Sequence, residues 1–241
     1  MNKKLNRKYV ETPTHEDLLH STASFLCNSV PGVGELFNFL FTAPAVKRRD
    51  NWIESLEQEI IKLQEQIPDI LQRIKNNENT ISAIMYASPL AIKTTNTEKL
   101  EALRNIIINT IICKNYEEYK IQMFLSFIDS FTEWHIRLLE YFSNPKNTAN
   151  KYIENYKLSK SQRIHSMQPF WDIYPNMFNE KPYLAIILDD LYSKNLLMVN
   201  KKVLTQMYNL KDNFFKIGYP YNKETTNLGD EFLKFISTPL T

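Results

Sequence analysis

Glycine is nearly absent from this chain of 241 residues. It occurs only at Gly32, Gly34, Gly218 and Gly229, so residues 35 to 217 contain none. Loops that hold phosphates through their backbone N–H groups need glycine, for positive φ angles and for close approach of the backbone. Neither a P-loop pattern nor a dinucleotide-binding pattern occurs. The sequence therefore argues against nucleotide-binding enzyme folds, and its periodicity favours helices.

The charge balance excludes a global attraction to nucleic acid or to an anionic membrane. Twenty-nine basic residues stand against 27 acidic ones, a net charge of +2, with 43% apolar and 12% aromatic residues. Any such binding would need a local patch. Cys27 and Cys113 belong to no Cys or Cys/His cluster, and no apolar run follows the basic first residues as a secretory signal would require. We expect a cytoplasmic protein, with peripheral association at the inner face of the membrane as the alternative.

The clearest periodic pattern predicts a helix that carries a narrow apolar seam. Its members alternate spacings of three and four residues: Ile53, Leu56, Ile60, Leu63, Ile67, Ile70 and Ile74. Asp50 or Asn51 is the expected N-cap, and Pro68 is expected to kink or break the helix. Packing within the chain is favoured over an intermolecular coiled coil, because proline interrupts the heptads.

Further helices are expected at 78–92, from a cap within 94–97 to Ile111, at 117–129, and from a cap at Thr132 to a stop at Asn144 and Pro145. Ile81, Ile84 and Met85 are assigned to the inner side of the first of these, and Thr132 to the N-cap of the last. Together they predict an N-terminal helical bundle over 1–145 with an apolar hairpin at its start. The basic stretch 146–168 reads as a linker or as a loosely packed helix.

Residues 169–241 are expected to form a winged-helix-like domain. A short piece at 170–178, a helix at 182–194, a strand at 196–199, a polar stretch and a last helix through Ile236 follow in that order. The predicted fold class is therefore mainly α: a helical bundle followed by a winged-helix-like C-terminal domain with a small β-ribbon.

Neither catalytic residues nor metal ligands nor cofactors are predicted. His15 and His20 are five residues apart, so on a helix they point in different directions and cannot share a zinc ion. His135 lies on an amphipathic helix, where a core position explains it better than an acid/base role with Asp129. Without a nucleophile motif beside these residues, we expect a protein that is not an enzyme.

An apolar segment at 25–46 is the first candidate contact surface. It contains Phe37, Phe39, Leu40 and Phe41 and is followed by Lys47, Arg48 and Arg49. Aromatic residues beside cations are typical of an anchor at the membrane interface. Burial in the helical core or in an interface between copies of the chain is the favoured alternative.

The C-terminal part offers a candidate nucleic-acid contact at Lys201, Lys202 and Lys211, in the expected wing. The preceding helix carries Asp189 and Asp190, whose carboxylates would repel phosphate. A protein partner or self-association is therefore favoured over non-specific DNA binding through the wing.

Three segments carry a family resemblance: KTTNTEKLEALRNIIINTI at 93–111, MFLSFIDSFTEWHIRLLEYFSNP at 123–145 and TTNLGDEFLKFIS at 225–237. They resemble a broad group of uncharacterised bacterial proteins with a helical N-terminal half and a winged-helix-like end. This layout is similar to that of alpha-type abortive-infection proteins of bacterial phage defence. The resemblance implies the fold and a defence role, and it brings no catalytic signature.

The function expected from the sequence is thus that of a non-enzymatic interaction protein of bacterial phage defence. Two alternatives stay open. One is a membrane-active effector that works through the 25–46 segment, and the other is a DNA-binding regulator that works through the basic wing.

Overall fold

A computed structural model describes residues 43–113, 116–158, 163–165, 167–198, 214–216 and 223–239. The chain divides into two compact units, Met1–Glu54 and Ser55–Thr241. The described part is mostly helical, and the fold is all-α. The prediction of a mainly helical chain is confirmed, whereas the predicted domain boundaries at 145 and 168 stay a prediction.

Helix α3 (Ala43–Gln66) and helix α4 (Ile70–Lys75) are separated at Pro68. The predicted break is confirmed, because proline removes a backbone donor and clashes with the preceding turn. The predicted start at Asp50 or Asn51 is wrong, since α3 begins seven residues earlier than Asp50. Only part of the apolar seam is buried: Leu56, Leu63 and Ile70 are, while Ile53 is 53% exposed.

Helices α5 (Glu78–Lys93), α6 (Thr97–Ile112) and α7 (Glu118–Ser130) pack against one another. Asn77 and Asn96 cap α5 and α6 by accepting a backbone N–H of the first turn. The buried side of α5 consists of small residues: Thr80, Ala83, Ala87 and Ala91. Met85, which the sequence placed inward, is 70% exposed. Alanines one turn apart let the neighbouring helices approach closely, so this side is preferred for burial.

A second group of elements follows. It contains α8 (Glu133–Ser143), α9 (Pro145–Asn155), α10 (Gln168–Ile173), the 3₁₀ turn η1 (Pro175–Phe178) and α11 (Lys181–Ser193). Asn144 ends α8 and begins α9, whose first residue is Pro145. Helix α11 packs on α8, and α9 packs on α8 and α10. Much of the stretch predicted as a linker or loose helix is thus helix α9.

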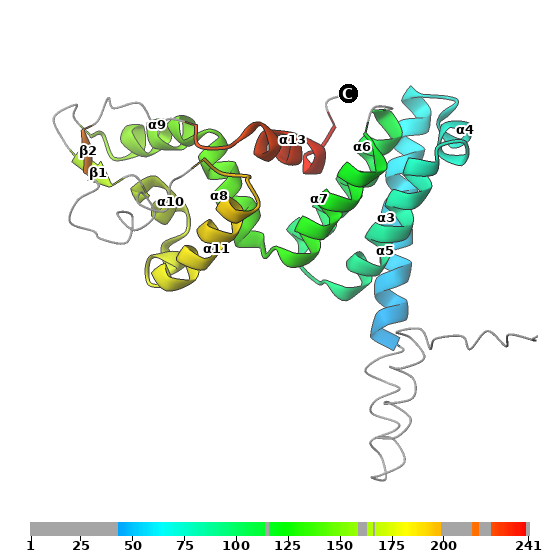
Figure 1. Cartoon of the computed structure of the whole chain (residues 1–241), viewed down its shortest axis with the longest axis horizontal. Coiled ribbons are helices and arrows are strands. Elements are labelled where there is room, and N and C mark those ends of the chain that lie inside the picture. Colours follow the sequence, from blue (N-terminus) through cyan, green and yellow to red (C-terminus); the bar gives the residue numbers. More distant parts are fainter. Residues whose placement is uncertain are drawn as a thin grey trace, which may run out of the picture. The chain divides into compact units, whose positions relative to one another are not determined.

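The last helix, α13 (Asn227–Ile236), lies between α6 on one side and α8 on the other (Figure 1). Its Phe232 and Phe235 are fully buried. Both rings lie 5.4 Å from the ring of Phe124 on α7, measured between centroids. Aromatic pairs at this separation add attraction beyond the area they bury. The final helix therefore joins the two groups into one core.

Buried amides hold the C-terminal end of α13. Asn105 Nδ2 donates to the carbonyl of Ile236 at 2.8 Å, and Asn109 Nδ2 donates to those of Phe235 at 2.8 Å and Ser237 at 3.0 Å. The last carbonyls of a helix have no partner within the helix, and leaving them unpaired in a core is costly. Helix α6 therefore supplies the C-terminal cap of α13.

The predicted winged-helix domain with a β-ribbon is wrong. In the described part of the chain, β1 (Arg163–His165) and β2 (Phe214–Lys216) are three-residue segments that pair antiparallel, Ile164 opposite Phe215. Because β1 precedes α10, this pair is not the β-ribbon that the prediction placed after the helix at 182–194. The described residues form an all-α fold, and the predicted ribbon is absent from them.

The strand expected at 196–199 also does not form in the described residues 196–198. Leu196 and Leu197 are both buried, so the side chains do not alternate between two faces as in a strand. Their backbone instead joins the residues before α13. Met198 N donates to Glu224 O at 2.7 Å, Thr226 N donates to Leu196 O at 3.0 Å, and Leu197 forms an isolated bridge with Thr225.

This junction explains the glycine at the start of α13. A Cβ atom at Gly229 would lie 2.3 Å from the carbonyl oxygen of Leu196, which is backbone and cannot move aside alone. Within a helix, glycine is otherwise less favourable than alanine. Close contact between α13 and residue 196 therefore decides the residue type.

We expect Gly229→Ala to lower the free energy of unfolding by about 1–3 kcal/mol, because the added methyl group overpacks a backbone contact. Urea unfolding of the full chain measures the change. Asn227→Ala, at an exposed position of the same first turn, is the control and should stay within about 0.5 kcal/mol of wild type. A more stable Gly229→Ala protein would show that helix propensity outweighs the contact.

Candidate functional site

His135 is a buried histidine at the start of α8, as the sequence predicted. Thr132 N donates to His135 Nδ1 at 3.0 Å, which forms a capping box with Thr132 as N-cap. The imidazole ring stacks on Phe131 at 4.6 Å between centroids, with 6° between the planes. Because Nδ1 accepts a hydrogen bond, the proton of the neutral ring lies on Nε2.

The partner of that nitrogen comes from α11. His135 Nε2 lies 3.3 Å from Asp190 Oδ2, and the other carboxylate oxygen forms an ion pair with Lys194 of the same helix. Asp129, the acid that the sequence offered, does not pair with the ring in the described part of the chain; its backbone carbonyl accepts from Lys99 Nζ at 3.1 Å. Both imidazole nitrogens are engaged, so His135 serves as a link between α8 and α11. No local pattern could reveal a partner 55 residues away.

A second polar cluster ties α6 to α8. Arg137 Nε lies 3.0 and 3.1 Å from the two carboxylate oxygens of Glu98. The guanidinium also lies over the rings of Trp134 and Tyr174, at 4.5 and 5.1 Å from their centroids. Bidentate pairing and stacking orient arginine strongly. With its charge paired and two neighbouring rings beside the guanidinium, Arg137 contributes to structure rather than to a binding site.

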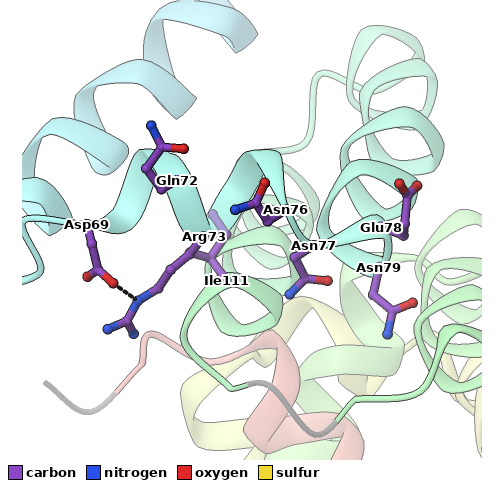
Figure 2. Close-up of a pocket in the computed structure, with 8 residues that line it drawn as sticks. All are labelled: Asp69, Gln72, Arg73, Asn76, Asn77, Glu78, Asn79 and Ile111. Carbon is purple, nitrogen blue, oxygen red and sulfur yellow. Dashed lines mark hydrogen bonds and ion pairs between the residues drawn. The ribbon is translucent and has the colours of Figure 1, made fainter.

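A polar groove lies beside the turn between α4 and α5, with a volume of about 530 Å³. Figure 2 shows its lining, in which carboxamides predominate and Ile111 of α6 is the single aliphatic side chain. Several polar groups are already engaged. Arg73 pairs with Asp69 at 3.0 Å, Asn77 caps α5, and Asn79 Nδ2 donates to Tyr116 O at 2.9 Å. Small-molecule sites are usually apolar with a few polar groups, so this groove does not fit one.

The outer face of α11 differs from these clusters, because large apolar side chains are exposed on it. We define the α11 outer face as Tyr183, Ile186, Asp189 and Tyr192. Ile186 is 67% exposed, and the tyrosines flank it at 37% and 43%. The opposite side of the helix carries the buried residues Leu184, Ile187, Leu188 and Leu191. A helical projection of these apolar residues is the signal that could have located the outer face from sequence.

Acidic residues surround this face. From 167 to 198, two lysines oppose four acidic residues, a formal charge of −2. Lys194 and Asp190 neutralise each other, which leaves Asp172, Glu180 and Asp189 against Lys181. Tyrosine is enriched at surfaces that bind other proteins, and carboxylates disfavour phosphate. The α11 outer face is therefore the candidate functional site.

The structure describes only three of the residues that the sequence singled out as contacts. Phe37, Phe39, Leu40, Phe41, Lys201, Lys202 and Lys211 fall outside the described residues. Lys47, Arg48 and Arg49 lie on α3, where Arg49 pairs with Asp50 at 2.9 Å. Within the described ranges no helix is both long and apolar enough to cross a membrane. The same ranges contain no cluster of three or more potential metal ligands among His, Cys, Asp and Glu.

No protein-family model, curated protein or solved structure matches this chain. The resemblance to abortive-infection proteins therefore stays a prediction, and the function is argued from the geometry of the described residues.

The His135 link makes stability depend on pH. Burial lowers the pKa of the imidazole below its ordinary value, against the opposing effect of Asp190. The folded protein thus favours the neutral ring, and this contribution is complete above the unfolded pKa of about 6.5. As the pH falls through the lower folded pKa, the ring is protonated, Nδ1 no longer accepts from Thr132, and the contribution is lost.

His135→Gln keeps a capping-box acceptor and removes the titration. We expect it to cost about 1–3 kcal/mol near neutral pH, because the contact with the Asp190 carboxylate is lost. Between about pH 7.5 and about pH 5, wild type should lose more stability in urea unfolding than the variant. Parallel pH profiles for the two proteins would contradict the assignment, because the remaining histidines are common to both.

Proposed function

We propose that this chain is a non-enzymatic interaction protein whose α11 outer face binds a basic, amphipathic segment of another protein. The observation that carries the proposal is the exposure of Ile186 between two tyrosines on an otherwise well-packed helix. Tyrosines are enriched at the energetic centres of interfaces, because they bury a large area and lose little side-chain entropy.

Charge decides the kind of partner. The α11 outer face includes Asp189, and Glu180 is exposed at the N-cap of the same helix. A cationic segment would be steered to this face and would meet complementary charge around the apolar centre. A second copy of the chain fits less well, because a two-fold symmetric contact through this face would bring its carboxylates close together.

A defence role for such an interaction follows from the family resemblance of the segments at 93–111, 123–145 and 225–237. Within the described residues both ring nitrogens of His135 already have partners, so we assign this histidine to a structural link and not to a general base.

A labelled synthetic helix of leucine and lysine tests whether the acidic charge and the apolar centre of the α11 outer face together bind a basic amphipathic segment. A helix of leucine and glutamate, which carries the opposite charge, is the matched control peptide. By fluorescence anisotropy the basic peptide should bind the full chain, and Ile186→Lys should weaken binding about tenfold or more. Met85→Lys is the control variant, since Met85 is 70% exposed on α5 and undergoes the same change of charge.

Equal affinity for the two peptides, or equal losses in the two variants, would refute the proposal. Light scattering of wild type and Ile186→Lys tests whether a second copy of the chain occupies the α11 outer face instead. A dimer that the substitution dissociates would assign the α11 outer face to self-association and not to a basic partner.

A further inference from the structure

Helix α9 presents a surface of a different kind. Asn144 caps it by accepting from Asn147 N at 3.3 Å, and Pro145 and Ala149 are its buried residues. The exposed side is amide-rich and basic. We define the α9 outer face as Lys146, Asn147, Asn150, Lys151, Glu154 and Asn155, all of which are exposed.

Along the chain this surface carries a net positive charge, and the Asp172 carboxylate reaches its edge at Tyr156. From 144 to 157, three lysines oppose one glutamate, a formal charge of +2. Lys146, Lys151 and Lys157 form no ion pair with any other residue that the structure describes. Lys157 is exposed in the turn that ends α9, one residue beyond the C-cap Tyr156, where its φ of 49° takes the chain out of the helix.

Tyrosines accompany the end of the helix. The ring of Tyr156 is 54% exposed and lies 4.7 Å from that of Tyr152, centroid to centroid, at 40°. The Tyr156 hydroxyl donates to the carboxylate of Asp172 on α10, which fixes the direction of the side chain. Tyr156 is thus held by Asp172 and by its neighbour Tyr152 and still remains more than half exposed.

We propose that the α9 outer face, with Lys157 and Tyr156, binds single-stranded nucleic acid. Lysine ammonium groups contact phosphates, asparagine amides pair with base edges, and a tyrosine ring stacks on an unpaired base. An anionic membrane would need several aliphatic or aromatic residues that enter the lipid, whereas this surface adds only Tyr156, whose hydroxyl is held by Asp172. This surface is separate from the α11 outer face and does not depend on a protein partner.

Fluorescence anisotropy with labelled oligothymidylate and oligouridylate, using the full-length chain, tests the proposal. Lys146→Gln, Lys151→Gln and Lys157→Gln together should weaken binding about tenfold or more. They should also make the plot of log K against log salt less steep by about 2, at about 0.7 for each lost phosphate contact. Tyr156→Ala should weaken binding about tenfold, whereas Tyr156→Phe should keep most of it, because stacking needs only the ring.

The control combines Lys75→Gln, Lys93→Gln and Lys234→Gln, three exposed lysines on α4, α5 and α13 that give the same change of net charge. It should leave both affinity and salt slope close to wild type. Equal losses of affinity in the control and α9 variants would refute a local site. The proposal would also be refuted if binding were abolished by Lys201→Gln, Lys202→Gln and Lys211→Gln and not by the α9 substitutions.

Two further probes separate other partners of similar charge. Duplex DNA that binds more tightly than oligothymidylate, without loss in Tyr156→Ala, would contradict single-strand recognition. Anionic vesicles that bind the chain while both oligonucleotides do not would overturn the proposal in favour of a lipid surface. The test of nucleic-acid binding does not depend on the leucine–lysine peptide, because that peptide tests only the α11 outer face.

Discussion

The pairing of two α6 amides with the end of α13 is the interaction on which the rest of this core depends. Most of the buried residues of α6 are apolar. Asn105 and Asn109 are buried among them, and their amides donate hydrogen bonds to the carbonyls of Phe235, Ile236 and Ser237. Each of these groups would be costly if buried without a partner. The register of α13 on α6 is therefore determined by hydrogen bonds, while its phenylalanines provide the buried area.

Because α13 also packs on α8, the end of the chain holds α5, α6 and α7 together with α8 and α11. The polar links act in the same way at other helix pairs. His135 and Asp190 connect α8 with α11, and Arg137 and Glu98 connect α8 with α6. In each link the charged groups lie at buried or partly buried positions. The polar groups that remain for partners are thus on the outer sides of the helices.

Two of those outer sides have opposite character, which the overall composition hides. The α11 outer face combines exposed Ile186 and tyrosines with acidic neighbours, and the α9 outer face combines lysines with asparagines. Their formal charges of −2 over 167–198 and +2 over 144–157 cancel within a chain of net charge +2. A nearly neutral protein can therefore carry two selective surfaces, because electrostatic attraction is local at physiological ionic strength. A cationic protein segment and a nucleic acid would be attracted to different helices of the same core.

The sequence by itself determined helices α5, α6, α7, α8 and α11 and several helix ends, whereas the start of α3 and helix α9 differ from what it predicted. Pro68, Asn144 with Pro145, and Thr132 act on the backbone within one turn, so their effects need no other part of the chain. Tertiary structure alone decided which residues of a helix are buried, as at Met85 and Ile53, because the side that packs depends on the shape of its neighbour. It also decided that Leu196 and Leu197 join α13 instead of a hairpin, and that His135 meets Asp190. These contacts link residues far apart in the chain, whose proximity exists only after the helices have packed.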